Sequence, residues 1–268
     1  MKRPLILLGQ TTVEGLRWLG ETQLLLWQAL GFVFRGRISR RETVRQMLIV
    51  QMSVIGFDSQ LIVFLTLLSG GMVLALNTSR FLVTWGATEF AGGGVALAVV
   101  RELAPVLTAV VVAARVGSAI AAELGSMKIS EQVDALRSLA VNPVEYLVVP
   151  RLLAAVVMLP VLTVLADAMG GLGAYLVGVT QGIPSQEFVR SVQRFLTSYD
   201  LLSGLIKAAV FGFIIGLVAC HSGLRARGGA EGVGRATTSS VVSTIVLIYL
   251  SDYVLSWILL SVQAMIAR

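Results

Sequence analysis

The chain has 268 residues, of which 56% are hydrophobic and only 13% are charged, and its formal net charge at pH 7 is +6. The charged fraction is about half that of a typical soluble domain, and apolar runs of about twenty residues recur along the chain. The composition therefore predicts an all-α protein that crosses a membrane several times, and it excludes a large soluble domain.

The same composition excludes several other classes of protein. The basic residues form no patch interleaved with exposed aromatic residues, which argues against nucleic-acid binding. The single cysteine, Cys220, excludes an internal disulfide, and the single histidine, His221, leaves no metal-ligand cluster of the usual spacing. We expect Cys220 to be a small packing residue in an apolar helix.

The N-terminal region, residues 1–56, is predicted to form helices on the cytoplasmic face of the membrane. Residues 4–34 mix Leu, Trp and Phe with Gln, Glu and Arg, and they contain no uninterrupted apolar run of about twenty residues, which indicates a helix lying along the interface. Ser39 and Glu42 have the spacing of a capping box, and they predict a second short amphipathic helix.

Residues 57–268 are predicted to form a membrane domain of five spans. Gly70 and Gly71 in the first span would allow another helix to approach closely. Pro150 and Pro160 predict a tilt, kink or break in the third span, which is longer than a bilayer requires. The approximate bounds of the five spans are 60–78, 94–122, 146–179, 202–224 and 239–266.

Basic residues predict the orientation of these spans. Of the 21 Lys and Arg residues, fourteen fall on the side of the N-terminus, four on the other side and three within spans. Because positively charged loops stay in the cytoplasm, the N-terminus is predicted to be cytoplasmic and the C-terminus to be outside. On the outer side, residues 184–200 place Phe188, Val192, Phe195 and Leu196 on one face, which predicts a helix lying on the outer membrane surface.

Charged residues within or near the spans are candidates for function. A charge at the centre of a span costs roughly 2.5 to 3.5 kcal/mol, so each one calls for a reason. Glu102 and Lys207 are singled out because opposite charges in neighbouring spans neutralise one another, although a structural ion pair or snorkelling explains them equally well. Arg115 and Glu123 are about two helical turns apart, a spacing that suits one shared face. The full set is Arg101, Glu102, Arg115, Glu123, Asp167, Lys207 and Asp252.

A polar segment, residues 126–137, separates the second and third spans on the cytoplasmic side. Ile129, Val133 and Leu136 recur at helical spacing, and polar residues fill the other positions. This pattern predicts a short amphipathic helix whose apolar stripe packs against the membrane domain or fills a groove in a partner. An ordinary solvated loop helix fits the composition equally well.

A glycine-rich segment, residues 228–238, has Gly229 and Gly234 at the first spacing of a phosphate-binding P-loop. That loop requires Lys and then Ser or Thr where this chain has Arg235 and Ala236, so no nucleotide site is predicted. A flexible cytoplasmic turn, capped by Thr237 or Thr238, is expected instead. Since no other segment offers a nucleotide loop, a nucleophile with its base or a metal site, we predict no catalytic residue, metal or cofactor bound by this chain.

The sequence RELAPVLTAVVVAARVGSAIAAELGSMKISEQVDAL, residues 101–136, followed by NPVEYLVVPR, closely resembles the signature region of the MlaE/YrbE permease family. The likeness extends to GMVLAL, LIKAAVFGFIIG, GGAEGVGRATTSSVV and SDYVLSW and covers roughly residues 40–265. It is strongest to the cyanobacterial and plastid branch of the family. Ala104 is a departure, because the family usually has Gly before the following proline.

The resemblance implies a function. It implies a permease subunit, in the cytoplasmic (inner) membrane, of an ABC transporter that moves phospholipid or a related lipid to or from an MCE-domain protein. It also implies a homodimer with a lipid cavity at the subunit interface, and a separate ATPase subunit that binds ATP and Mg. The polar segment would be the coupling helix that docks into this ATPase through Ser126, Lys128, Ile129, Glu131, Gln132, Val133, Asp134, Leu136 and Arg137. The lipid route would pass Arg101, Glu102, Lys207, Leu67, Leu74 and Asn77.

Two functions from other classes are weighed against this one. A self-sufficient secondary transporter or channel would use Glu102, Asp167 and Asp252 as an ion relay, but five spans without a detectable inverted repeat count against it. An intramembrane enzyme lacks an acid, base and nucleophile set with a supporting spacing. The sequence leaves open whether Glu102 and Lys207 contact each other or the lipid.

Overall fold

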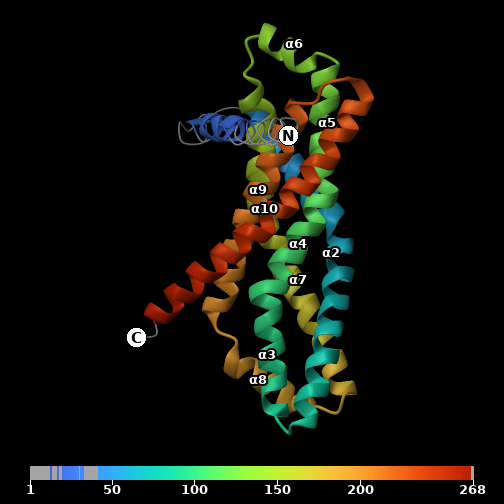
Figure 1. The fold of residues 1–268 in the computed structure, drawn as a ribbon, viewed down its shortest axis with the longest axis vertical. Helices are drawn as coiled ribbons and strands as arrows, with labels where there is room; N and C mark the ends of the chain where they lie inside the picture. Colours follow the sequence, from blue (N-terminus) through green and yellow to red (C-terminus); the bar gives the residue numbers. More distant parts are fainter. Residues whose placement is uncertain (1–12, 14–16, 18–19, 30, 33–41, 267–268) are drawn as a thin grey trace, which may run out of the picture.

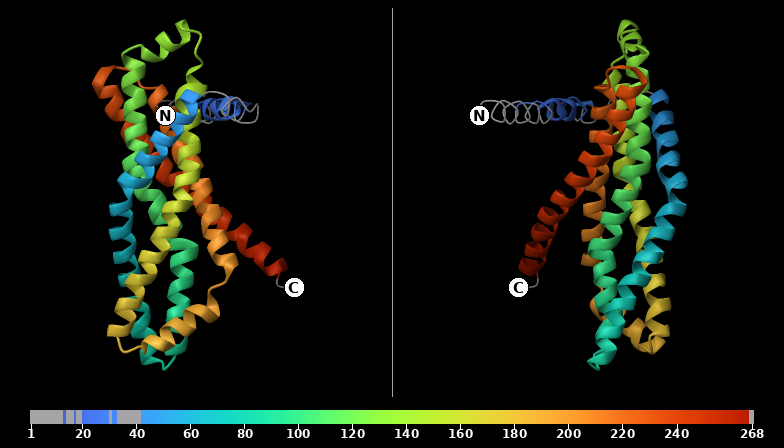
Figure 2. Two further views of the ribbon diagram at one scale, coloured as in Figure 1. Left: turned by 180° about the vertical axis from the view of Figure 1, so that it is seen from behind. Right: turned by 45° about the vertical axis from the view of Figure 1, so that its right-hand side comes forward.

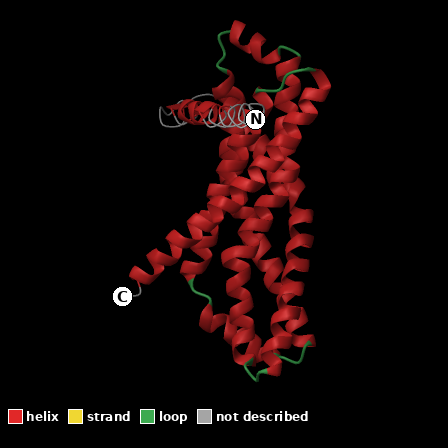
Figure 3. Ribbon diagram, viewed as in Figure 1, coloured by secondary structure: helices red, strands yellow, loops and turns green. Residues whose placement is uncertain are grey.

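The computed structural model describes residues 13, 17, 20–29, 31, 32 and 42–266. These residues form helices joined by short loops, and no strand occurs among them (Figure 3). The elements are α2 (Glu42–Thr84), η2 (Thr88–Phe90), α3 (Ala91–Ala98), η3 (Val99–Leu103), α4 (Ala104–Val112), η4 (Ala113–Gly117), α5 (Ser118–Ile129), α6 (Gln132–Ser138), η5 (Val144–Val148), α7 (Val149–Thr180), α8 (Ser185–Phe195), α9 (Ser198–Leu224) and α10 (Gly229–Ile266).

Five helical stretches of the described chain are long and apolar enough to cross a membrane, which confirms the predicted all-α membrane fold. They run along the long axis of the molecule, with α6 and α8 at opposite ends (Figure 1). From the predicted orientation, we call the end with α6 the cytoplasmic end and the end with α8 the outer end. Short 3₁₀ or π-helical turns join shorter helices into the second and third stretches. The five are Arg45–Thr84, Thr88–Ile129, Val144–Thr180, Ser198–Leu224 and Gly229–Ile266.

Helix α7 is the centre of the bundle and packs against both α2 and α9. Small residues allow this contact: a Cβ added at Gly71 on α2 would lie 2.0 Å from the carbonyl oxygen of Gly170 on α7. A Cβ at Gly212 on α9 would lie 2.4 Å from the carbonyl oxygen of Ala155. Small residues at an interface allow two helices to approach closely in a bilayer, and the predicted close contact at Gly71 is confirmed.

Helix α10 is covered over little of its length. Its first half packs against α9 and α5, whereas its second half leans away from the bundle (Figures 1 and 2). Large apolar side chains are therefore exposed there, including Leu250, Tyr253 and Trp257 with exposed fractions of 62%, 76% and 68%. This half of α10 presents an apolar face with no covering helix from its own chain.

Two helices lie crosswise to the spans. The described residues 20–29 are helical and cross the cytoplasmic end of the bundle, with Leu25 and Ala29 buried and Leu24 and Trp27 exposed (Figure 2). A helix is therefore present within residues 4–34, as far as those residues are described, and its place at the membrane interface stays a prediction. At the outer end, α8 confirms a helix within the predicted segment, but it is shorter than predicted, because Leu196 is extended and α9 begins at Ser198. Its place on the outer membrane surface stays a prediction.

One predicted boundary differs from the structure. No second short helix is separated from the first span, because α2 is continuous from Glu42 to Thr84, while Ser39 lies outside the described residues. Position 56 therefore falls inside α2, and the division of the chain there stays a prediction. Helix α7 passes through Pro160 without a break, because a proline there removes only one backbone hydrogen-bond donor. Pro150 lies in the first turn of α7, where a backbone N–H has no partner within the helix.

The glycine-rich segment is also more regular than predicted. Gly228 and Gly229 adopt positive φ angles of 89° and 70°, which reverse the chain, and α10 begins at Gly229. The Thr237 hydroxyl donates to the Val233 carbonyl at 2.8 Å, and the Thr238 hydroxyl donates to the Gly234 carbonyl at 3.1 Å. These threonines therefore lie within the helix and do not cap it.

Candidate functional site

Lys207 on α9 lies at the centre of a polar cluster within the spans. Its side chain is only 2% exposed, and its Nζ donates to Glu102 Oε2 at 2.8 Å and to Ser256 Oγ at 2.6 Å. The same ammonium donates to the backbone carbonyl of Arg101 at 3.0 Å and forms an ion pair with Asp252 at 3.0 Å. The cost of burying this lysine is thus offset by two carboxylates and two neutral oxygen acceptors.

Arg101, the neighbour of Glu102, makes a second set of contacts. Its Nε donates to Asp200 Oδ1 at 2.6 Å, and its guanidinium also donates to Gln263 Oε1 at 2.9 Å. Asp200 is fully buried and closes the capping box of α9 by accepting from the backbone and the hydroxyl of Thr197, both at 2.7 Å. The start of α9 is therefore tied to η3.

We call this set the membrane charge cluster. Two cations and three carboxylates belong to it, so its formal charge is negative by one. Glu102 is 49% exposed and Arg101 is 25% exposed, and both line a small cavity of about 60 Å³ between α9 and α10. η3 is a π-helical turn, a feature frequent at functional sites. The cluster consists of Arg101, Glu102, Asp200, Lys207, Asp252, Ser256 and Gln263.

The structure answers one question that the sequence left open, because Glu102 and Lys207 contact each other. Sequence reasoning missed Asp200, Ser256 and Gln263 as members of the cluster. The sequence does contain a signal for Asp200, because Thr197 and Asp200 have the spacing of a capping box at the start of a helix. Ser256 follows Asp252 by one helical turn and so lies on the same face of α10.

The first-span residues predicted for the lipid route differ in their surroundings. Leu67 is fully buried within the helix packing of the single chain. Leu74 is half-buried, and Asn77 is exposed, with its amide donating to the Val73 carbonyl at 3.0 Å. Their assignment to a lipid route stays a prediction.

The remaining charged residues have separate surroundings. Arg115 contacts Ser59 at 3.2 Å and Asp58 at 3.8 Å on α2, whereas Glu123 pairs with the buried Arg151 at 2.8 Å. Arg115 and Glu123 therefore have different partners. Asp167 makes no hydrogen bond or ion pair within the described chain, and it lines an apolar pocket of about 460 Å³ between α3, α7 and α8.

The polar segment at the cytoplasmic end is not one helix, which corrects the prediction for residues 126–137. Helix α5 ends at Ile129, Glu131 takes a left-handed conformation with φ of 61°, and α6 begins at Gln132. Val133 is only 2% exposed whereas Ile129 is 36% exposed, so the two do not form one continuous stripe. The break lies at Glu131, whose left-handed backbone cannot continue the right-handed helix that ends at Ile129.

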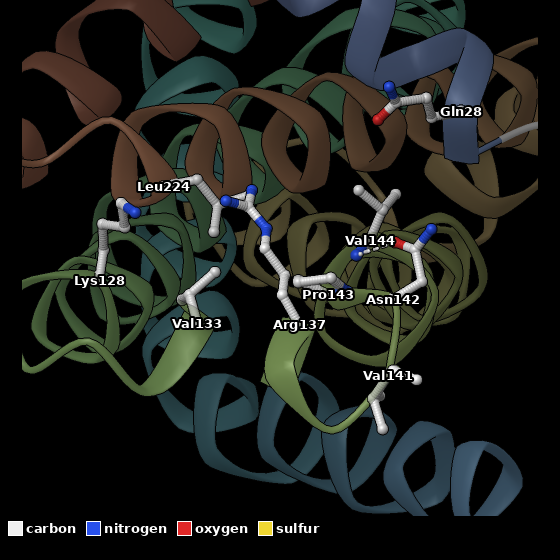
Figure 4. A pocket seen from close by; sticks show the side chains of 10 residues that line it. Gln28, Lys128, Val133, Arg137, Val141, Asn142, Pro143, Val144 and Leu224 are labelled. Atoms are coloured by element: carbon white, nitrogen blue, oxygen red, sulfur yellow. Dashed lines mark hydrogen bonds between the residues drawn. The ribbon is translucent and has the colours of Figure 1, made fainter. Parts of the chain in front are cut away.

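An ion-pair network holds this turn in place. The Lys128 ammonium donates to Asp134 Oδ2 at 2.8 Å across the turn, and Arg137 donates to Asp134 Oδ1 at 3.0 Å. The hydrogen bond from Lys128 holds the pKa of Asp134 below its ordinary value of 3.8. Lys128 and Arg137 also line a groove of about 460 Å³ that reaches Gln28 and Leu224 (Figure 4). Of the nine residues predicted for coupling, all but Val133 keep accessible surface at this end.

Comparisons with known proteins agree with this architecture. Residues 48–258 match the family model described as Permease MlaE. A probable ABC transporter permease protein of Synechocystis is 42% identical over 236 residues, which cover 88% of each chain. A protein of the same description from Rickettsia typhi is 39% identical over 257 residues, which cover 96% of this chain and 97% of the relative.

A plant relative is also similar to this chain. The chloroplastic protein Trigalactosyldiacylglycerol 1 of Arabidopsis thaliana is 39% identical over 241 residues, which cover 89% of this chain and 67% of that protein. The matched family region includes the break between α5 and α6 and every member of the membrane charge cluster except Gln263. The chain is a multi-pass membrane protein, and it belongs to the MlaE family of permeases.

Proposed function

We propose that this chain is the permease subunit of an ABC transporter that moves phospholipid, or a related lipid, between the cytoplasmic membrane and an MCE-domain protein. The observation that carries the proposal is the membrane charge cluster, which opens between α9 and α10 inside a largely apolar bundle. Charges at this depth are expensive, and they are typical of a route for polar groups through the membrane.

The chemistry of the cluster suits a lipid head group. Arg101 offers a guanidinium that is 25% exposed, and Lys207 lies behind the half-exposed Glu102. A phosphate approaching this opening would compete with Asp200 and Glu102 for these cations, while the acyl chains lie on the apolar face of α10. The name of the Arabidopsis relative is that of a lipid, which supports a lipid as the substrate class.

A second copy of the chain completes the route in this proposal. The outer half of α10 carries exposed apolar side chains beside the cluster, including Tyr253 and Trp257. In a homodimer, these faces would enclose a cavity between the two subunits, so that the head group meets the cluster away from bulk lipid. The homodimer rests on this uncovered face and on the resemblance to the family.

Energy comes from a separate ATPase subunit that binds ATP and Mg, and the permease itself is not an enzyme. The accessible turn between α5 and α6 is the docking element, with Lys128, Glu131, Asp134 and Arg137 facing the partner. The Glu123–Arg151 ion pair, 2.8 Å long, ties α5 to α7, the helix at the centre of the bundle. A push on the turn would therefore reach α7 through the buried Arg151.

Copurification and reconstitution test the proposal together. The tagged chain is expressed at native level and solubilised gently, and its protein partners and lipids are identified by mass spectrometry. We expect an ABC ATPase, an MCE-domain protein and bound phospholipid, with ATP-dependent lipid transfer in liposomes. A single-component oligomer that moves substrate along an ion gradient without ATP would show that the chain is a secondary transporter.

The structure provides one argument against that secondary transporter. Glu102 and Asp252 both contact Lys207, but Asp167 lies in a different, apolar pocket and makes no contact with either of them. The three carboxylates predicted for an ion relay are therefore not joined in the described chain.

A further inference from the structure

A basic crevice lies at the cytoplasmic end of the bundle, between the last turn of α9 and the first turns of α10. Its volume is about 360 Å³. It is separate from the membrane charge cluster, because His221 follows Lys207 by about 21 Å along the axis of α9. Its polar lining consists of His221, Ser222, Arg225, Arg227, Arg235 and Ser239.

Glycines in the connecting loop build this crevice. Gly228 and Gly229 reverse the chain with positive φ angles, and a Cβ at Gly232 would lie 1.8 Å from the Arg227 carbonyl oxygen. The loop therefore packs directly on the first turn of α10, which only glycine allows. A Cβ at Gly228 would lie 3.4 Å from a guanidinium nitrogen of Arg235. Two arginines of the loop, Arg225 and Arg227, and Arg235 of α10 thus converge on one opening.

The charges around the crevice are not balanced. Arg225 pairs with Glu21 of the N-terminal helix at 3.0 Å, and Arg235 pairs with Glu231. Arg227 has neither an ion pair nor a hydrogen bond in the part of the chain that the structure describes. Among the residues that the structure describes, no carboxylate lines the crevice, although Glu21 contacts His221 and Arg225 from the N-terminal helix. A guanidinium fork is well suited to phosphate oxygens, so an anion that carries a phosphate group is the ligand this lining favours.

The position of the crevice indicates the source of that phosphate. The helix that carries Glu21 lies crosswise at this level, with Leu24 and Trp27 exposed at 62% and 67%. Exposed Leu and Trp on a crosswise helix are typical of residues seated at the membrane interface. The opening therefore lies at the depth of lipid head groups. We propose that the basic crevice binds the phosphate group of an anionic phospholipid of the cytoplasmic leaflet, separately from the transported lipid.

Lipid binding to the purified full-length chain tests this proposal. Native mass spectrometry in detergent would measure binding of dioctanoyl phosphatidylglycerol, with dioctanoyl phosphatidylcholine as the zwitterionic comparison. We expect preferential binding of the anionic lipid, and a loss of about fivefold in affinity for Arg227→Gln, from about 1 kcal/mol per basic residue at a membrane surface. Ala236→Phe would fill the crevice without changing its charge, and we expect it to abolish the preference.

A matched control removes the same charge elsewhere. Arg45→Gln changes an exposed arginine on the same membrane side, outside the crevice, and we expect wild-type binding. Competition by millimolar sodium phosphate would show that the phosphate group alone suffices, whereas no competition would show that the site requires the lipid.

Two outcomes would overturn the proposal. One is wild-type lipid binding by both Arg227→Gln and Ala236→Phe. The other is an Arg227→Gln variant that loses a copurifying protein partner but binds the lipid normally, since the crevice would then be a protein contact. Neither outcome bears on the lipid route, because the two sites share no residue.

Discussion

The Lys207 ammonium lies 2.8 Å from the Glu102 carboxylate, although 105 residues separate them in sequence. The contact joins the fourth span to the second, and Asp252 brings in the fifth through the same ammonium at 3.0 Å. One buried lysine thus joins three spans at the opening of the membrane charge cluster. This relationship makes Lys207 the residue whose removal has the clearest consequence.

Replacing Lys207 with methionine is expected to destabilise the protein by about 3 kcal/mol, because Glu102 and Asp252 lose their common cation. We place the cost at the lower end of the range for buried pairs, since Glu102 is half-exposed. Thermal unfolding in detergent, followed by circular dichroism, measures the effect. The double variant Lys207→Met with Asp252→Asn should recover part of the loss. Wild-type unfolding of the single variant would contradict the role of the cluster in stability.

Gly71→Ala is expected to destabilise the bundle by roughly 3 kcal/mol, because its Cβ would lie 2.0 Å from backbone of α7, which cannot move aside cheaply. Gly94→Ala is the matched control. Nothing lies within 4 Å of a Cβ at Gly94, so the same change should stabilise helix α3 by roughly 0.5–1 kcal/mol. Unfolding midpoints of the two variants would move in opposite directions, and equal shifts would show that α2 and α7 are not in close contact.

The Lys128–Asp134 ion pair predicts a pH dependence at the cytoplasmic turn. Because the pKa of Asp134 is lowered in the folded protein, its contribution is complete above the ordinary value of 3.8 and is lost as pH falls through the lowered pKa. The difference in unfolding midpoint between wild type and Asp134→Asn should be constant from neutral pH to about pH 5 and shrink below about pH 4. A difference that persists unchanged at pH 3 would mean that the pair does not form.

Charge reversal at the same turn tests docking of the proposed ATPase. Glu131→Arg combined with Asp134→Arg should abolish copurification of the ATPase and ATP-driven lipid transfer, while phospholipid still copurifies with the permease. The control is Arg190→Glu with Arg194→Glu on α8, at the outer end of the molecule, which should leave ATPase binding intact (Figure 1). Unchanged ATPase binding in the first variant would place the docking surface elsewhere.

The sequence by itself determined the fold class and the number of spans, and it predicted the sidedness of the chain. Each of these predictions depends on hydropathy and charge summed over about twenty residues, so one misassigned residue changes the result little. The close contact at Gly71 was also predictable, because small residues within an apolar span typically mark a site where another helix packs closely. The family likewise followed from an ordered set of local motifs.

The tertiary structure decided which charged residues pair with one another and where some of the helices begin and end. Nothing local distinguishes Asp58 from Glu123 as the partner of Arg115, because the choice depends on how α2, α5 and α7 are rotated and packed. The break at Glu131 and the early start of α10 depend on backbone conformations with positive φ at Glu131, Gly228 and Gly229, which hydrophobic periodicity does not register. The membrane charge cluster and the basic crevice both assemble residues from separate helices, so each exists only once the spans are side by side.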